Sequence, residues 1–192
     1  MSVLTETHPQ PSVGIRLAGR HEAAAIARVL HESFAEFQAR YTPQGYAATT
    51  PDDAGVRGRM AEGPAWVAVS DDAIVGTASA VKKSGGSLHI RGMAVVPAGR
   101  GQGIGGMLLD TLDRHARAQG YNRLTLCTTP FLSAAIRLYE CFGFRFITEG
   151  PSDLFGTPLL NMAKLLGGES ELYEEQRKEQ LCRRIMETLA FA

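Results

Sequence analysis

Between residues 95 and 109 the chain reads Val95-Val96-Pro97-Ala98-Gly99-Arg100-Gly101-Gln102-Gly103-Ile104-Gly105-Gly106-Met107-Leu108-Leu109, so that an apolar run leads through a glycine-rich turn into a helical pattern. Glycine removes the side chain where another group must approach the backbone closely. A helix that begins at Ile104 offers unpaired N–H groups and a positive dipole end. Together these features predict an anion site for a phosphate or pyrophosphate group.

The spacing of the glycines decides which phosphate ligand is expected. Gly101, Gly103 and Gly106 satisfy the dinucleotide pattern G-x-G-x-x-G, which requires the first glycine directly after a strand and an acid about 20 residues later. Five residues separate Val95 from Gly101, and the predicted strand 123–128 contains no acid. A dinucleotide-dependent oxidoreductase is therefore a weak alternative, and comparing NADH with coenzyme A binding would test it.

Another spacing fits better, namely Arg or Gln, two residues, Gly, one residue, then Gly or Ala. Arg100, Gly103 and Gly105 satisfy it, whereas the phosphate-loop sequence Gly-Lys-Ser/Thr is missing. At these residues the chain resembles the GNAT superfamily of N-acetyltransferases, whose acetyl-CoA pyrophosphate loop has this spacing. A second segment, Ala135-Ile136-Arg137-Leu138-Tyr139-Glu140-Cys141-Phe142-Gly143-Phe144, is similar to the family signature A-x-x-L-Y-E-x-x-G-F. The resemblance covers roughly residues 13–164.

The resemblance and the order of predicted elements imply the same fold class. We expect an α/β protein with the GNAT-type acyl-CoA N-acyltransferase fold, in which helices flank a mixed central sheet of about six to seven strands. A mobile N-terminal tail is predicted over residues 1–12, the acetyltransferase domain over 13–166, and a C-terminal helical extension over 167–192. The stripe of apolar residues late in that extension predicts docking on the domain or a homodimer.

The resemblance also implies the site residues. The strand residues Met93, Ala94 and Val95 are expected to pair their backbone with the pantetheine arm of acetyl-CoA. Backbone amides of the turn are expected to hold the pyrophosphate, and these residues are Arg100, Gly101, Gln102, Gly103, Ile104, Gly105 and Gly106. The implied reaction is transfer of acetyl from acetyl-CoA to a primary amine by direct attack, with a small molecule or a protein as the acceptor and no metal.

Tyr139 has two interpretations. A phenol of pKa about 10 stays protonated at neutral pH and can donate to the coenzyme A thiolate, a role that the resemblance implies. The alternative is a core aromatic residue at helical spacing. The general base is not evident, because residues 88–93 include no acid. His89 or a water chain could serve instead. Leu132 stands where the family often has asparagine. A non-catalytic acyl-CoA sensor therefore remains an alternative function.

Composition narrows the class of protein further. The chain has 20 basic and 20 acidic residues, so its formal charge is zero, which does not favour bulk binding to nucleic acid. Three cysteines without close spacing predict neither a disulfide framework nor a zinc site. No apolar run approaches the ~18 residues of a membrane span. The N-terminus has no apolar signal core, so we expect a cytoplasmic protein without membrane contact.

Two local predictions concern the acceptor side of the molecule. Residues 38–51 are rich in Tyr, Pro, Gly and Thr, which is typical of a loop. Phe37, Tyr41, Pro43 and Tyr46 in and beside this segment are candidates to line an acceptor pocket. After it, Asp52 or Asp53 is expected to cap a short helix that ends near residue 63.

Overall fold

Alternating apolar residues build a seven-stranded sheet at the centre of the chain. In the computed structural model, which describes residues 13–167, the strands lie in the order β1-β2-β3-β4-β5-β9-β6. Adjacent strands are antiparallel except β4 and β5, which are parallel. The strands are β1 (Gly14–Leu17), β2 (Ala65–Ser70), β3 (Ala73–Lys83), β4 (Ser87–Val95), β5 (Arg123–Thr128), β6 (Arg145–Ile147) and β9 (Leu160–Leu165). The predicted mixed sheet is therefore confirmed.

Local turn chemistry explains the connections. The β2–β3 hairpin turns at Asp71 and Asp72, whose φ angles of 47° and 61° fit the two-residue turn that follows strand twist. Gly85 and Gly86, with φ of 68° and 70°, make the next turn. Parallel strands cannot be joined by a hairpin, so β4 and β5 require a crossover, which helix α4 (Ile104–Ala118) supplies.

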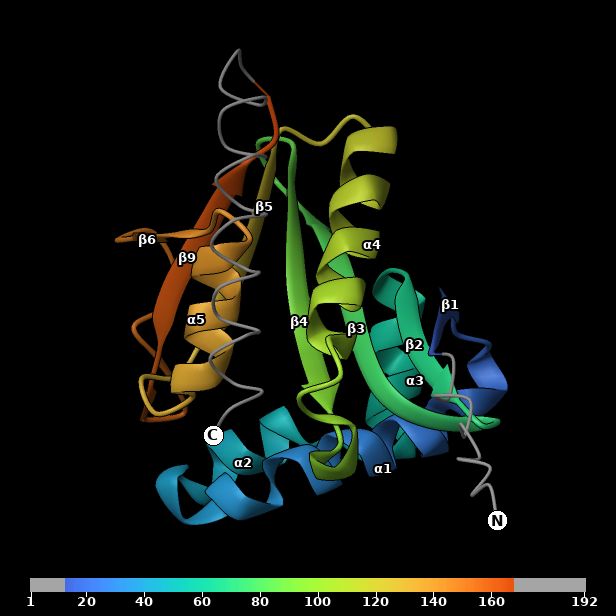
Figure 1. The fold of residues 1–192 in the computed structure, drawn as a ribbon. Helices are drawn as coiled ribbons and strands as arrows, with labels where there is room; N and C mark the ends of the chain where they lie inside the picture. Colours follow the sequence, from blue (N-terminus) through green and yellow to red (C-terminus); the bar gives the residue numbers. More distant parts are fainter. Residues whose placement is uncertain (1–12, 168–192) are drawn as a thin grey trace, which may run out of the picture.

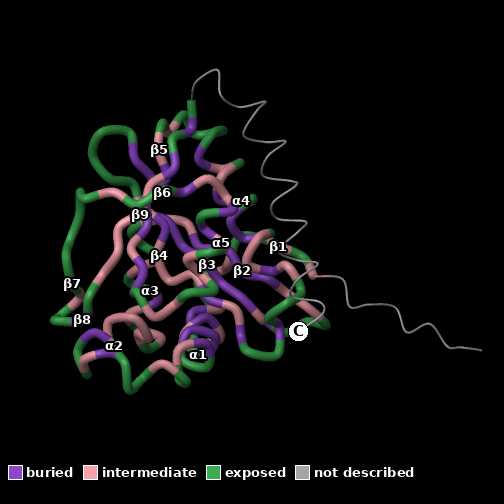
Figure 2. Tube along the Cα trace, turned by 60° about the vertical axis from the view of Figure 1, so that its left-hand side comes forward, coloured by how far each residue is buried: buried purple, intermediate pink, exposed green. Residues whose placement is uncertain are grey.

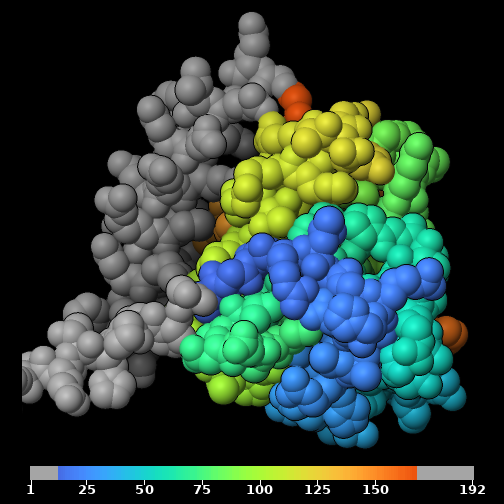
Figure 3. Space-filling view, turned by 90° about the vertical axis from the view of Figure 1, so that its right-hand side faces the viewer, coloured from blue at the N-terminus to red at the C-terminus, as the bar shows by residue number. Residues whose placement is uncertain are grey.

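Helices cover both faces of the sheet, as Figure 1 shows. Helix α1 (Ala23–Phe34) packs against β3, β4 and α3 (Asp53–Glu62), while α4 packs on β2, β3 and β4. The remaining helices are α2 (Pro43–Thr49), α5 (Ser133–Cys141), η1 (Arg20–Glu22), η2 (Ala35–Arg40) and η3 (Pro97–Gly99). In Figure 3 the blue segment of β1 and α1 lies between the yellow α4 and the cyan α2–α3 segment.

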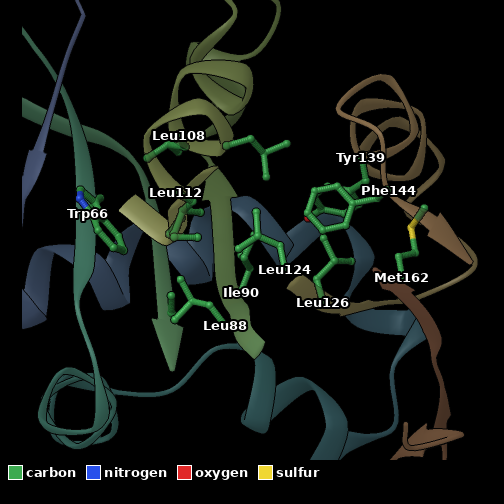
Figure 4. Close-up of a cluster of buried hydrophobic side chains, with 14 of the residues drawn as sticks. Trp66, Leu88, Ile90, Leu108, Leu112, Leu124, Leu126, Tyr139, Phe144 and Met162 are labelled. Atoms are coloured by element: carbon green, nitrogen blue, oxygen red, sulfur yellow. The ribbon is translucent and has the colours of Figure 1, made fainter. Parts of the chain in front are cut away.

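The core is divided between two clusters, one on each face of the sheet. The larger cluster joins α4 and α5 to the sheet and includes Trp66, Leu112 and Phe144, drawn in Figure 4. The smaller cluster joins α1 and α3 to the sheet through residues such as Val29 and Val67. Figure 2 shows these buried segments in purple at the centre of the molecule. Each fully buried large side chain contributes roughly 1.5–3 kcal/mol to stability.

The predicted tail over residues 1–12 and nearly all of the predicted C-terminal extension lie outside the described residues, which end at Gly167. The docking or dimer contact of the extension therefore stays a prediction.

The prediction of a loop over residues 38–51 was wrong. Helix η2 continues to Arg40, and α2 occupies Pro43–Thr49. The Thr42 side chain accepts a hydrogen bond from the Gly45 N–H, and Pro43 stands at the first helical position, where its missing N–H has no cost. A small hairpin of β7 (Asp153–Leu154) and β8 (Thr157–Pro158) was also not predicted. It packs on α2 through the Thr157 hydroxyl, which lies 3.0 Å from the Thr42 nitrogen.

The cap of α3 gives a first testable prediction. Asp52 is the N-cap, and its Oδ1 accepts a hydrogen bond from the Gly55 N–H at 2.8 Å. Asp52→Ala removes this acceptor and is expected to lower the free energy of unfolding by about 1 kcal/mol. Asp110→Ala is the control, because it breaks only an exposed ion pair with Arg114 and is expected to change stability by less than about 0.5 kcal/mol. Equal urea midpoints for the two variants would contradict the assignment.

Candidate functional site

Strands β4 and β5 pair over only part of their length. Ser87 to Ile90 pair with Arg123 to Leu126, and within residues 13–167 no pair between these two strands follows. Figure 1 shows the strands side by side near the top and apart toward α1 and α2. The edge of β4 that faces β5 is therefore open along its last residues, Arg91 to Val95.

A bulge in β4 lies where the strands part. Arg91 pairs with Ser79 of β3, and Ala94 pairs with Thr77, so that two β4 residues between them face one β3 residue. The first of the two is Gly92, whose φ of 58° is accessible to glycine at little cost. Such an extra residue bends a strand and changes the direction of the groups that follow it.

The backbone after the bulge faces two directions. The Val96 N–H donates to the Val75 carbonyl of β3 at 2.9 Å. Because backbone groups alternate sides along a strand, Met93 and Val95 direct theirs toward the open edge, and Ala94 directs its own toward β3. Of the three predicted pantetheine contacts, Met93 and Val95 thus offer free-edge backbone, whereas Ala94 offers none.

The glycine-rich turn leads from this edge into α4. Gly101 and Gly103 have φ of 77° and 75°, in the left-handed region that other residues rarely adopt. Gly103 is the N-cap of α4, and because glycine has no side chain it caps none of the first N–H groups of the helix. The first N–H groups of α4 are therefore available to an anion, as the sequence predicts.

The next two glycines allow α4 and α5 to approach closely. A Cβ atom at Gly105 would lie 2.8 Å from Leu138 Cδ2, and one at Gly106 would lie 3.5 Å from Phe142 Cζ. The close approach of Leu138 leaves no room for a Cβ atom at Gly105 unless Leu138 shifts, whereas the distance at Gly106 is an ordinary van der Waals contact. The two signature segments identified in the sequence are thus in direct contact.

The polar side chains of the turn are directed back onto the protein. Arg100 donates to the Ser33 carbonyl at 3.0 Å and forms an ion pair with Glu36, which ties the turn to α1 and η2. Gln102 Nε2 donates to the Ala98 carbonyl at 3.1 Å. The side chains of Arg100 and Gln102 are therefore engaged within the protein, and the backbone N–H groups of the turn are the donors that remain for a ligand.

Tyr139 lies in α5, beside the point where the strands part. Its ring is 7% exposed and packs 5.9 Å from the Phe144 ring, in the same cluster as Leu126, the last β5 residue paired with β4. Figure 4 shows these side chains together. Burial, with a smaller contribution from Tyr41, raises the pKa of Tyr139 to about 12. The phenol is both a core residue and a proton-bearing group at neutral pH.

His89 lies away from the open edge. It precedes Met93 by four positions, which corresponds to about 13 Å along a strand. Its Nδ1 lies 3.0 Å from the Thr125 hydroxyl. Burial, and then the charges of Lys83 and Arg91, lower the pKa of His89 to about 4. These observations argue against His89 as the general base.

Aromatic side chains gather where η2 approaches the loop after β5. Phe131 lies 4.9 Å from the Tyr41 ring in an edge contact and 6.3 Å from the Phe37 ring in a stacked one. The Arg40 guanidinium lies 4.7 Å over the Phe131 ring. Tyr46 adjoins Tyr41 at 6.1 Å. Three of the four predicted acceptor-side residues are thus brought together, and Phe131 joins them from a segment that the sequence pattern did not single out.

Two general features complete the description of residues 13–167. None of their helices has the length and apolar character needed to cross a membrane. They contain no group of three or more His, Cys, Asp or Glu side chains placed to hold a metal ion.

Known proteins share both the sequence pattern and the fold. The model of the acetyltransferase (GNAT) family matches residues 26–144. The Escherichia coli K12 protein named "Uncharacterized N-acetyltransferase YjgM" is 33% identical over 144 residues, which span 72% of this chain and 85% of that protein.

Solved structures share the fold at lower identity. The PaiA N-acetyltransferase of Thermoplasma acidophilum, in complex with coenzyme A, has a TM-score of 0.67 at 16% identity and covers 80% of this chain and 99% of its own. The yncA protein of Salmonella typhimurium, with its cofactor acetyl-CoA, has a TM-score of 0.63 at 24% identity and covers 82% and 96%.

Proposed function

This chain belongs to the acetyltransferase (GNAT) family, and on that premise we propose that it transfers an acetyl group from acetyl-CoA to a primary amine by direct attack. One observation carries the proposal. The open edge of β4 leads directly into a glycine turn whose backbone N–H groups lie at the start of α4. Acetyl-CoA needs a strand edge for the pantetheine arm that ends in its thioester, followed by an anion site for its pyrophosphate, and the chain offers both in this order.

The described residues fit acetyl-CoA. The open-edge backbone of Met93 and Val95 can pair with the pantetheine amides, much as an added strand pairs with a sheet edge. Residues 100–106 supply N–H groups at a positive helix end for the pyrophosphate, and the left-handed Gly101 and Gly103 keep Cβ atoms away from it. Acetyl-CoA brings the acetyl group already activated as a thioester.

The residues of the chain contribute positioning and electrostatics. Backbone N–H groups at the end of β4 polarise the acyl carbonyl oxygen, as an oxyanion hole does. The Tyr139 phenol donates a hydrogen bond to the thiolate sulfur. Because its pKa is about 12 and that of a thiol about 8.5, full proton transfer is uphill, so the hydrogen bond itself is the stabilising contribution. A water path to bulk solvent takes the proton that the amine loses.

An acceptor screen that detects released coenzyme A thiol tests this function. Turnover with any primary amine, dependent on acetyl-CoA, supports it. The competing function is a non-catalytic acyl-CoA sensor, which is favoured by the absence of an acid on β4 and by the distance of His89 from the open edge. Tight acetyl-CoA binding without turnover of small amines or of protein N-termini and lysines would favour the sensor.

The side chain of Arg100 gives a prediction about the turn. Arg100→Ala removes an exposed ion pair with Glu36 and the hydrogen bond to the Ser33 carbonyl, and leaves the backbone amides of the turn in place. The dissociation constant for acetyl-CoA is expected to change by less than about fivefold, because such pairs contribute ~0–1 kcal/mol. Arg114→Ala, on an exposed face of α4, is the control. A loss of affinity well beyond this range in calorimetry would show that the guanidinium itself binds the ligand.

A further inference from the structure

Arg59 reaches from α3 to the bulge of β4. Its Nη2 donates to the carbonyl oxygen of Ala48 in the last turn of α2. Its Nη1 lies 3.8 Å from the position that a Cβ atom would take at Gly92. The guanidinium is therefore beside the bulge, on the face of the sheet that α1 and α3 cover, and one residue from the open-edge backbone of Met93.

The charges around Arg59 do not balance. Other arginines of this region each have a carboxylate partner, in the ion pairs Arg57–Asp53, Arg91–Glu62 and Arg100–Glu36. Within residues 13–167 the Arg59 side chain donates one hydrogen bond, to the neutral Ala48 carbonyl, and the carboxylate that acts on its charge is Glu62, which is ion-paired with Arg91. A partly buried guanidinium that shares its one acid with a second arginine is costly, because the hydration it has lost is only partly replaced.

A second cation increases the imbalance. Arg91 Nη2 donates to the Arg59 carbonyl at 3.1 Å, and its Nε is buried without a hydrogen-bond partner among the described residues. Burial, and then the charge of Arg91, lower the pKa of Arg59. Glu62 is the carboxylate next to this pair, and its side chain is 54% exposed. Two guanidinium groups thus lie between β4 and α3 and share one largely solvated acid.

We infer that the acceptor amine carries a carboxylate, and that Arg59, with Arg91 beside it, binds this carboxylate. The inference rests on the proposed function. A guanidinium presents a planar fork of donors that matches a carboxylate in two parallel hydrogen bonds. An α-amino acid separates its amine from its carboxylate by a single carbon. That short span suits a carboxylate held beside Gly92 and an amine directed to the adjacent edge of β4.

Apolar and aromatic side chains adjoin the segments that meet at Arg59. Leu30 Cδ2 lies 3.8 Å from the same Cβ position at Gly92. The aromatic group of Phe37, Tyr41 and Phe131 approaches α2 through Tyr41, whose ring lies 6.1 Å from that of Tyr46, and α2 also carries the Ala48 carbonyl that Arg59 binds. An α-amino acid with an apolar or aromatic side chain, rather than a polyamine or a basic peptide, fits a site of this charge.

Binding of product analogues tests the inference without requiring turnover. The full-length protein, saturated with coenzyme A, is titrated by calorimetry with N-acetyl-L-phenylalanine and with N-phenethylacetamide, the same molecule without its carboxylate. N-acetyl-L-leucine and N-isopentylacetamide form a second pair. In at least one pair the acid is expected to bind at least about tenfold more tightly, the effect of hydrogen bonds to a charged group. If the acid fails to bind more tightly than its matched amide in both pairs, the inference is overturned.

Variants assign the preference to Arg59. Arg59→Met keeps the length of the side chain and removes its charge, and is expected to reduce the preference for the acid to about twofold or less. Arg59→Lys should retain part of the preference, because lysine keeps the charge but loses the fork. Arg57→Met, two positions along α3 on the exposed surface, is the control and should bind like the wild type. A folded Arg59→Met variant with an undiminished preference also overturns the inference.

The two proposals fail in different ways. Acetylation of amines with no preference for a carboxylate would leave the proposed function standing and overturn the carboxylate site. Arginine-dependent binding of the acids without any acetyl transfer would support the carboxylate site and count against the enzyme. If the wild-type acid preference is present, the inference is supported even where Arg59→Met does not fold.

Discussion

Replacing Gly103 with glutamate is expected to weaken acetyl-CoA binding by at least about tenfold, which corresponds to about 1.4 kcal/mol. Two physical effects act in the same direction. The left-handed φ of 75° at this N-cap strains any residue with a Cβ atom. The new carboxylate stands at the end of α4 that attracts anions, where it competes with and repels a pyrophosphate. Isothermal titration calorimetry with acetyl-CoA measures the change.

A matched substitution separates the site from general strain. Gly85 in the β3–β4 turn has a similar φ of 68°, and a Cβ there would meet nothing within 4 Å. Gly85→Glu therefore introduces the same charge and comparable strain away from α4. We expect it to bind acetyl-CoA like the wild type. A folded Gly103→Glu variant with unchanged affinity would remove the pyrophosphate assignment.

Tyr139→Phe is expected to lower kcat by about 10²-fold or less, the range of a single group that acts on a proton. The ring and its packing against Phe144 are kept, so stability should change little, and KM for acetyl-CoA should be nearly unchanged. Because burial raises the pKa of Tyr139 to about 12, the phenol keeps its proton throughout the neutral range. No loss of kcat assignable to Tyr139 is therefore expected as the pH rises from 6 to 9.

The control for this experiment is a tyrosine that packs on the same cluster away from the parting strands. Tyr121 precedes β5 and is partly buried against the large cluster. Tyr121→Phe should retain wild-type kcat. If Tyr139→Phe also retains it, under conditions where the chemical step limits the rate, Tyr139 is a core aromatic residue and nothing more.

The sequence predicts well those parts of the molecule where a local rule applies. The sheet strands, α4 and its start at Ile104 follow from apolar periodicity and from glycine at positions of positive φ. The N-cap at Asp52 follows from side-chain chemistry. Helix α2 was missed because its seven residues make only about two turns and include Pro, Gly and Thr, which are common in loops, although Thr42 and Pro43 together were a start signal.

The tertiary parts of the site could not be read from spacing. Gly105 is small because Leu138, far along the chain, lies against it. Arg59 matters because α3 carries it to the bulge of β4 while each nearby carboxylate pairs with a different arginine. Close packing and charge pairing of this kind depend on which segments meet in space, and a short sequence motif does not show which charged side chains pair.

The bulge at Gly92 reverses which face of the sheet the later side chains of β4 occupy. In an unbroken strand Leu88, Ile90, Ala94 and Val96 would share one face, because the side-chain period is two. Leu88 and Ile90 instead belong to the cluster beneath α4, and Ala94 and Val96 belong to the cluster beneath α1. Because of this one inserted residue, positions that would otherwise share a face contribute to both core clusters, Leu88 and Ile90 to one and Ala94 and Val96 to the other. Deleting the extra residue would therefore exchange the faces of Ala94 and Val96 and move them out of the cluster beneath α1.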